Sequence, residues 1–284
     1  MTKFKIVIDS SVDLSKELLA LIDPVMIPLN VHLGEHTFLD YVELNANALY
    51  DKMKELKASP KTSAASPGLF IETFKKLQDE GINEVLWVGI GNDFSATIKS
   101  AQLAVEELPG MKIRLIDSYS LSSGSGLLAL RAHDLREAGK SLDETADYLD
   151  TISKNVRAQF IVDNLDMLAL GGRVTGMKLF FGRILRAHPY LQVNDGKLEV
   201  VATPKGKSEK ALDVMLDVTE AEIKAGLESP RVLITHSLGG TRIDYIKERL
   251  EKVVDPKDIF VTEAGAVISS HCGEGTIGVL YIRK

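Results

Sequence analysis

The chain has 284 residues, of which 45% are hydrophobic and 26% are charged, and its formal net charge is −6. These proportions are typical of a globular protein, and the acidic balance argues against general nucleic-acid binding, which needs clustered Lys and Arg. No apolar run approaches the roughly 20 residues that cross a bilayer, and no secretory signal is visible, so we expect a cytoplasmic protein without stable membrane insertion.

The first half of the sequence alternates short apolar runs with longer helical patterns. We predict strands at residues 4–8, 25–33, 84–90 and 112–116, and helices at residues 14–22, 46–56, 68–77, from 95, 126–137 and 141–155. Alternation of this kind favours a mostly parallel sheet with helices on both faces. Residues 1–160 are therefore expected to form an α/β domain.

The second half has a different pattern of predicted elements, with several short strands and fewer helices. Strands are predicted at residues 158–162, 190–193, 198–202, 232–235, 259–268 and 278–282, and helices at residues 208–224 and 241–253. Asn194-Asp195-Gly196 between two of these strands is a hairpin signal. Residues 161–284 are expected to form an α+β domain with hairpins, and the ligand is expected at the interface of the two domains.

A glycine turn connects the strand at residues 84–90 to the next helix, and it contains Gly91 and Ser95. A helix N-terminus directs N–H groups at whatever lies above it, so this turn could hold an anion. The dinucleotide fingerprint G-x-G-x-x-G is incomplete, because Phe94 and Ala96 stand where its last glycine would be needed. We place Ser95 in the first turn of the helix, either as an ordinary cap or as a ligand contact.

Three other segments offer groups that suit an anionic ligand. Thr62 and Ser63 precede a helix whose cap is Ser66, so their hydroxyls are free to donate and accept. Arg173 follows two glycines and carries a charged fork suited to a carboxylate or phosphate, unless it forms a surface salt bridge. His271 is expected in a turn between the last two strands, either as a structural group or as a donor to an anion.

The sequence offers little for metal or nucleophilic chemistry. The six histidines are scattered without ligand spacing, and the single cysteine, Cys272, cannot build a cysteine metal site, so no metal and no cofactor are predicted. Ser237 lies in a turn similar to a serine nucleophile elbow, but Thr235 stands where G-x-S-x-G requires glycine. No catalytic residue is assigned.

In their order along the chain, these segments resemble the DegV family. The resemblance covers nearly the full length and is carried by Asp9-Ser10-Ser11-Val12-Asp13-Leu14, Thr62-Ser63, Phe94-Ser95-Ala96-Thr97, Asp117-Ser118, Gly171-Gly172-Arg173 and His271-x-Gly-x-Gly. It implies two α/β domains that enclose a long-chain fatty acid such as palmitate. It also implies a lipid-binding protein rather than an enzyme, which presents the acyl carboxylate to a separate fatty acid kinase for acyl phosphate formation in phospholipid metabolism.

The resemblance also implies roles for single residues. Thr62 and Ser95 match the hydroxyls that hold the carboxylate, with Ser63 beside them, and His271 matches the nearby histidine. Arg173 matches an arginine that serves the pocket rim or the partner. The chain departs from the family pattern at Asp93, Ala96, Cys272 and Glu274. Because an ionised Asp93 would repel a carboxylate, we expect its side chain to point away.

A carboxylate is also the anion that best suits the glycine turn, since hydroxyls and a helix N-terminus can hold one negative charge without lysine or metal. A tail of about 14 methylenes, buried at ~0.8 kcal/mol each, contributes roughly 11 kcal/mol before ordering costs.

Two alternative functions stay open. One is an enzyme acting on a small acyl or phosphorylated substrate, either a serine hydrolase using Ser237 or Ser95 with His271, or a phosphotransferase using the glycine turns. The other is an adaptor recognised by a partner protein.

Overall fold

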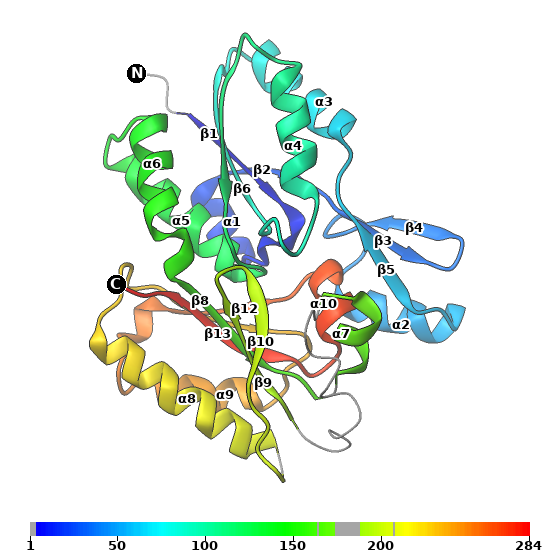
Figure 1. Ribbon diagram of the computed structural model, residues 1–284, viewed down its shortest axis with the longest axis vertical. Helices are drawn as coiled ribbons and strands as arrows, with labels where there is room; N and C mark the ends of the chain where they lie inside the picture. The colour runs from blue at the N-terminus through cyan, green and yellow to red at the C-terminus, as the bar shows by residue number, and fades with distance from the viewer. Residues whose placement is uncertain (1–3, 164, 174–187, 207) are drawn as a thin grey trace.

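The structure is a computed structural model that describes residues 4–163, 165–173, 188–206 and 208–284. A parallel four-stranded sheet and a mostly antiparallel six-stranded sheet lie one above the other along the long axis, and a small third sheet projects to one side (Figure 1). The predicted fold class, an α/β N-terminal part and an α+β C-terminal part with hairpins, is confirmed. None of the helices in the described ranges is both long and apolar enough to span a bilayer.

The four-stranded sheet has the order β2-β1-β6-β7, and all its pairs are parallel. Its strands are β1 (Lys5–Asp9), β2 (Val25–Ile27), β6 (Glu84–Gly89) and β7 (Lys112–Asp117). Helices α1 (Lys16–Ile22), α5 (Ser123–Glu137) and α6 (Leu142–Ile152) cover one face, and α3 (Pro67–Asp79) and α4 (Thr97–Glu106) cover the other. Alternate residues of a strand therefore enter different cores. Leu86 packs in the first and Trp87 in the second, which is why these runs are apolar throughout.

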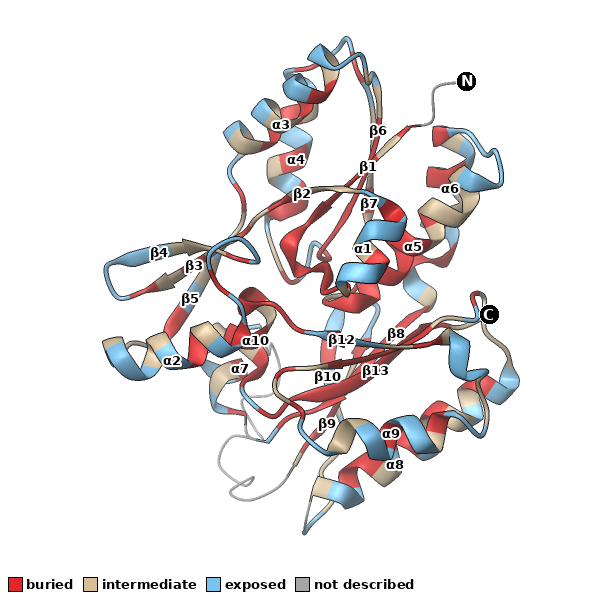
Figure 2. Ribbon diagram, turned by 180° about the vertical axis from the view of Figure 1, so that it is seen from behind, coloured by how far each residue is buried: buried red, intermediate tan, exposed pale blue. Residues whose placement is uncertain are grey.

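The six-stranded sheet has the order β10-β9-β8-β13-β11-β12, and only β11 and β12 pair in parallel. Its strands are β8 (Val156–Ile161), β9 (Tyr190–Asn194), β10 (Lys197–Ala202), β11 (Val232–His236), β12 (Ile259–Glu263) and β13 (Ile277–Ile282). Helices α8 (Ser208–Ala225) and α9 (Arg242–Leu250) cover its outer face. The inner face shares a hydrophobic core with α5, so buried residues run continuously from one sheet to the other (Figure 2).

The third sheet was not predicted. It consists of β3 (Asn30–Leu33), β4 (His36–Leu39) and β5 (Pro60–Ser63), is antiparallel, and lies beside helix α2 (Ala46–Leu56). The single strand expected at residues 25–33 is wrong, because Pro28 has no N–H to donate to a ladder and the chain changes sheet there. Strand β5, which carries Thr62 and Ser63, lies where the sequence predicts no strand.

The strand expected at residues 259–268 is also wrong, because β12 ends at Glu263 and helix α10 (Ala266–Cys272) follows. Two buried carboxylates from distant segments accept hydrogen bonds from the start of this helix. Asp13 Oδ1 accepts from the N–H of Gly265 at 2.8 Å, and Asp40 Oδ1 accepts from the N–H of Ala266 at 2.7 Å. A helix N-terminus capped from 226 and 252 residues away leaves no local sequence signal.

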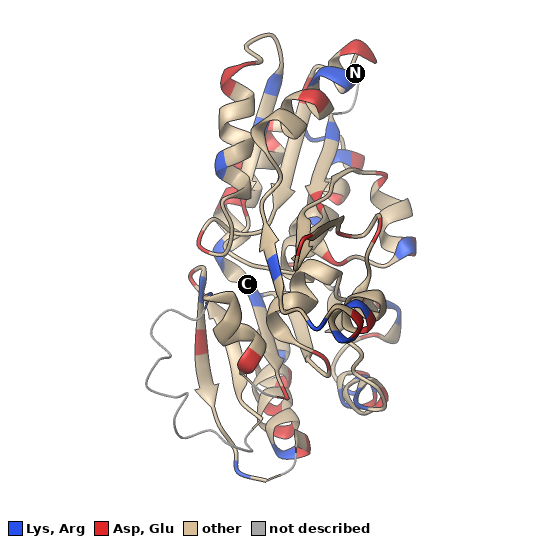
Figure 3. Ribbon diagram, turned by 90° about the vertical axis from the view of Figure 1, so that its right-hand side faces the viewer, with Lys and Arg blue, Asp and Glu red and all other residues tan. Residues whose placement is uncertain are grey.

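The remaining elements are short. They are α7 (Asp166–Gly171) and the 3₁₀ helices Ser10–Val12, Ser153–Asn155 and Pro256–Asp258. The expected division between residues 160 and 161 stays a prediction, although all of β8 belongs to the six-stranded sheet. In the view of Figure 3, Lys and Arg are interspersed with Asp and Glu rather than gathered on one element.

Candidate functional site

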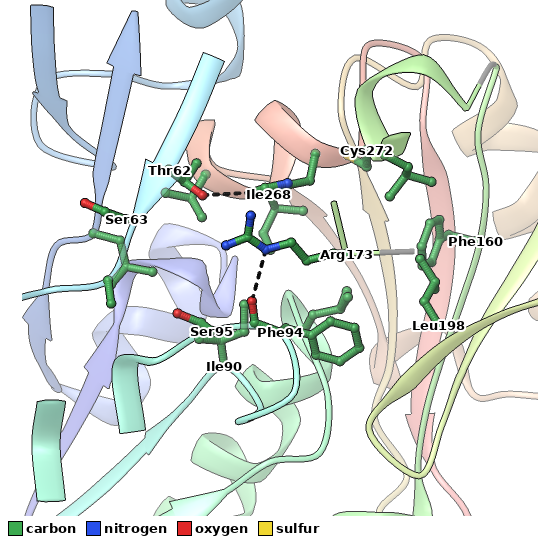
Figure 4. A pocket seen from close by; sticks show the side chains of 16 residues that line it. Thr62, Ser63, Ile90, Phe94, Ser95, Phe160, Arg173, Leu198, Ile268 and Cys272 are labelled. Carbon is green, nitrogen blue, oxygen red and sulfur yellow. Dashed lines mark hydrogen bonds between the residues drawn. The ribbon is translucent and has the colours of Figure 1, made fainter. Parts of the chain in front are cut away.

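A pocket lies where the parallel sheet, β5, α7, α10 and the six-stranded sheet meet. Its wall includes five polar residues, Thr62, Ser63, Ser95, Arg173 and His271. The rest of the wall is apolar apart from one thiol: Leu29, Ala64, Ile90, Phe94, Leu121, Phe160, Leu168, Leu198, Val267, Ile268 and Cys272. All five predicted site residues therefore line one cavity, although they come from segments up to 209 residues apart. Thr62, Ser63 and Ser95 lie on one side of the cavity, opposite Phe160 and Leu198 (Figure 4).

Strand β5 positions two of the hydroxyls. It pairs with β3 in the register Val31 to Thr62, which directs neighbouring side chains to opposite faces. The Thr62 hydroxyl lies 2.7 Å from His271 Nε2 and is half-buried. The Ser63 hydroxyl is exposed and lies 3.0 Å from His32 Nε2, so it belongs to the rim of the pocket.

Ser95 stands just before α4 rather than in its first turn, which corrects the predicted position. Its hydroxyl oxygen accepts a hydrogen bond from the N–H of Thr97 at 3.3 Å and lies 2.8 Å from the Thr97 hydroxyl. The loop reaches this position because Gly91 packs against the backbone of Ser120, where a Cβ would come within 2.9 Å of the nitrogen. Ser95 thus lies at the positive end of α4, where the helix dipole favours an anion.

His271 lies in the last turn of α10, not in a turn between strands as predicted. Its Nδ1 is buried, has no hydrogen-bond partner among the described residues and faces Gly171, where an added Cβ would lie 2.1 Å from it. Burial lowers the pKa of His271 to about 4, with a smaller contribution from the charge on Arg173. The imidazole is therefore neutral at pH 7.

The unpartnered Nδ1 also favours one tautomer of that neutral imidazole. A proton on Nδ1 would be a buried donor without an acceptor, whereas a proton on Nε2 can be donated to the Thr62 hydroxyl oxygen at 2.7 Å. In this tautomer the hydroxyl proton of Thr62 remains available. The pair can then donate one hydrogen bond from Thr62 to an acceptor inside the pocket.

Arg173 supplies the positive charge of the pocket. Its Nε donates to the carbonyl oxygen of Phe94 at 3.3 Å and its Nη1 to that of Gly171 at 2.6 Å, so the hydrogen bonds found are to carbonyls rather than to a surface carboxylate. The guanidinium points toward the side of the pocket that carries Thr62 and Ser95 (Figure 4). No Asp, Glu or Lys is among the described residues that line this cavity, so its electrostatics favour an anion.

The geometry gives little support to the hydrolase alternative. Ser237 is buried, and its hydroxyl bonds to the Tyr50 hydroxyl at 2.7 Å and to the Ser269 hydroxyl at 2.8 Å, neither of which is a general base at neutral pH. Ser95 bonds to Thr97 rather than to a histidine. Burial raises the pKa of the Cys272 thiol to about 12, so it stays protonated and is a poor nucleophile.

Two other expectations concern Asp93 and metal binding. Asp93 is exposed and is absent from the cavity wall; it lies against the β9–β10 turn, where its Oδ2 would be 3.2 Å from a Cβ at Gly196. Within the described ranges, no group of three or more His, Cys, Asp or Glu could hold a metal ion.

Sequence reasoning missed three buried aspartates that hold segments of the cavity wall in place. Asp9, Asp13 and Asp40 are buried and do not line the cavity, yet Asp9 accepts from the N–H of Ile90 at 2.9 Å, and the other two cap α10. The run Asp9-Ser10-Ser11-Val12-Asp13 could have indicated them, because polar side chains directly after a buried strand need hydrogen-bond partners inside the protein. Burial raises the pKa of Asp40 to about 6.

Comparisons with known proteins agree on one family. The model of the DegV family, described as "Uncharacterised protein, DegV family", matches residues 3–284. A DegV domain-containing protein from Clostridium perfringens is 31% identical, covering 99% of this chain and 98% of the relative. A DegV family protein from Thermus thermophilus, described as binding fatty acid, superposes with a TM-score of 0.90 at 28% identity over 100% of both chains. A stearic acid-binding protein from Eubacterium ventriosum superposes with a TM-score of 0.86 at 27% identity, covering 99% of this chain and 98% of that one.

Proposed function

The chain belongs to the DegV family, and we propose that its pocket binds one long-chain fatty acid, with the carboxylate at the polar side and the acyl chain between the two sheets. The observation that carries this proposal is the convergence of Thr62, Ser63, Ser95, Arg173 and His271 on one cavity whose other wall residues are apolar apart from Cys272. Solved relatives that are described as binding fatty acid or stearic acid support it.

The polar side suits a carboxylate better than a phosphate. One guanidinium and a few neutral hydroxyls match a single negative charge, whereas a phosphate ester commonly carries two. Neutral His271 orients the Thr62 hydroxyl without adding a second charge. The carboxylate would accept from Thr62 and Ser95 and pair with Arg173 at the rim.

The apolar side suits a hydrocarbon chain. It is built from Leu, Ile, Val, Phe and Ala side chains of the six-stranded sheet, of α7 and α10, and of loops beside the parallel sheet, which offer a chain no hydrogen-bonding group that would be left unpaired. Burial of each methylene contributes about 0.8 kcal/mol, so the chain rather than the head group supplies most of the affinity. A long saturated acid such as palmitate is the ligand we propose to test first.

We further propose that the protein has no turnover of its own and presents the acyl carboxylate, in the cytoplasm, to a separate fatty acid kinase that supplies acyl phosphate to phospholipid synthesis. The exposed Arg173 and Ser63 lie at the rim, so a partner could reach the head group while the chain stays covered. Purified protein loaded with palmitate, a candidate kinase, Mg²⁺ and ATP should give acyl phosphate, which hydroxylamine traps as a hydroxamate. Kinase that makes the hydroxamate equally well from free palmitate would contradict the presenting role.

Lipid extraction tests binding itself. Protein purified under native conditions should release C14 to C18 acids near one per chain when extracted with organic solvent, as measured by mass spectrometry. Delipidated protein should take up added palmitate to the same ratio. An empty pocket that refuses palmitate overturns the proposal. Ester hydrolysis that disappears in Ser95→Ala or Ser237→Ala would instead favour the hydrolase alternative.

A further inference from the structure

The three-stranded sheet that carries Thr62 has two faces of opposite character. On one face Val31 and Leu33 of β3 are buried, and Thr62 contacts His271. Because side chains alternate along a strand, the residues between these project from the opposite face. That face is exposed or half-buried, and besides Leu39 it carries five polar residues, which we call the polar face: Asn30, His32, Thr37, Lys61 and Ser63.

Hydrogen bonds connect four of these residues. The Nδ1 of His32 lies 2.8 Å from the hydroxyl of Thr37, which stands directly opposite it in the ladder. Its Nε2 lies 3.0 Å from the Ser63 hydroxyl, to which Nδ2 of Asn30 donates at 3.2 Å. When Nε2 carries the imidazole proton, the Ser63 oxygen accepts from both neighbours, and its own proton has no acceptor among the described residues. The network then leaves one hydroxyl proton for a ligand.

Lys61 adds a positive charge beside this network. It stands directly opposite His32 in the ladder and two residues before Ser63, so the three side chains project from the same face. Lys61 is exposed, and it forms no ion pair within the part of the chain that the structure describes. An ammonium without a carboxylate partner, next to a hydroxyl that can donate, suits a group with more negative charge than a carboxylate, such as a phosphoryl group.

Ser63 belongs both to the polar face and to the wall of the pocket. Its hydroxyl points away from the Arg173 guanidinium, whereas the Thr62 hydroxyl on the other face of the strand bonds to His271 (Figure 4). In an acyl phosphate the phosphorus is bonded to an oxygen of the former carboxylate, so the phosphoryl group lies just outside the carboxylate position. Ser63 is therefore the residue at which such a group meets the polar face.

We propose that the polar face binds the phosphoryl group of a long-chain acyl phosphate whose acyl chain stays in the pocket. This inference rests on the proposed function, because it concerns the product that a kinase makes from the bound acid. Lys61 pairs with the phosphoryl oxygens and Ser63 donates to one of them, while His32 is a positioning residue that orients the Ser63 hydroxyl. Lys61 and His32 thus contribute to affinity for the product and not to affinity for the free acid.

The test compares a product analogue with the free acid. The analogue is the β-keto phosphonate of palmitoyl phosphate, in which a methylene replaces the bridging oxygen, so that it does not hydrolyse. It and palmitate each compete with a fluorescent fatty acid for delipidated wild type and variants. Lys61→Met removes the ammonium, and Lys54→Met removes the same charge from an exposed position on α2, outside the polar face, as the matched control.

We expect Lys61→Met to weaken binding of the phosphonate about fivefold, as for the loss of one charge pair at the surface, and binding of palmitate less than about twofold. Lys54→Met should change both by less than about twofold. Wild type that binds neither ligand overturns the proposed function. Wild type that binds palmitate but rejects the phosphonate overturns this inference alone, and so do equal losses of phosphonate affinity in the two lysine variants.

His32 variants test the positioning role. His32→Leu should weaken binding of the phosphonate and spare palmitate, and His32→Gln, whose amide can still donate to Ser63, should restore most of the loss. An unchanged affinity in His32→Leu, or a loss that His32→Gln leaves in place, contradicts that role. Thermal unfolding of the ligand-free variants checks that they fold. If His32→Leu does not fold, the exposed Lys61→Met decides the proposal.

Discussion

The two ends of α10 hold buried ionisable groups of opposite kinds. At its N-terminus, the carboxylates of Asp13 and Asp40 accept hydrogen bonds from backbone N–H groups; at its C-terminus, His271 contacts Thr62. Burial raises the pKa of Asp40 to about 6 and lowers that of His271 to about 4, so in both cases it disfavours the charged form. The N-terminal end ties the helix to distant parts of the chain, while the C-terminal end places a neutral imidazole beside Thr62 in the wall of the pocket.

The largest effect on stability is expected when the hydrogen bonds at the N-terminal end of α10 are removed. Asp40→Ala leaves the N–H groups of Ala266 and Val267 and the hydroxyl of Ser10 without their acceptor. We expect the free energy of unfolding to fall by about 3 kcal/mol, because several buried donors lose a partner. Urea unfolding measures this change.

Asp40→Asn is the control for this experiment, since its amide oxygen can still accept from the helix. It should cost less than half as much as Asp40→Ala. Equal losses in the two variants would show that the charge, rather than the hydrogen bonds, holds the helix.

The two ends of α10 also differ in how they contribute to stability as pH changes, because their contributions have opposite signs. Between pH 6.5 and about 4 the unfolded chain binds a proton at His271 before the folded chain does, so this end loses stability as pH falls. Between pH 6 and about 4 the folded chain binds a proton at Asp40 first, so that end gains stability as pH falls.

The two contributions, each up to about 3 kcal/mol, largely offset one another in the wild type. Relative to wild type, His271→Gln should therefore gain stability on acidification from pH 7 to 4.5, and Asp40→Asn should lose it. Unfolding free energies measured across this range check both signs. Parallel curves for all three proteins would contradict these assignments.

A smaller effect is expected at the C-terminal end, where ligand affinity is the readout. The double variant Thr62→Ala with Ser95→Ala removes two hydroxyls from the pocket and should weaken palmitate binding at least tenfold, about 1.4 kcal/mol. Competition binding to the delipidated variant measures this loss. Ser66→Ala, which removes a helix cap outside the cavity, is the matched control and should leave affinity within twofold of wild type. Unchanged affinity in the double variant would place the head group elsewhere.

Much of the fold was predictable because its signals are local. The strand with Leu86 and Trp87 is apolar on both faces, which indicates a parallel sheet covered by helices, and Asn194-Asp195-Gly196 does form the turn between β9 and β10. The order of short polar motifs predicts five candidate site residues, and all five line one cavity. Their contacts with a carboxylate stay a prediction.

The missed features depend on distant contacts. Helix α10 is not predicted: its first residues fall in the strand expected at residues 259–268 and His271 in an expected turn, since the caps Asp13 and Asp40 come from the other end of the chain. Strand β5 is not predicted, because among the described residues its strand partner is β3 alone, which lies far earlier in the chain. Local patterns cannot indicate such pairings, whereas they do indicate helix and strand periodicity.

The most direct test of the central claim is a titration of delipidated protein with palmitate carrying ¹³C at its carboxyl carbon, followed by NMR. The proposed function predicts one bound carboxyl resonance that saturates at one equivalent per chain and that shifts or disappears in the Thr62→Ala, Ser95→Ala double variant. Absence of a saturable resonance, or a bound resonance that the double variant leaves unchanged, would contradict a carboxylate site formed by Thr62 and Ser95.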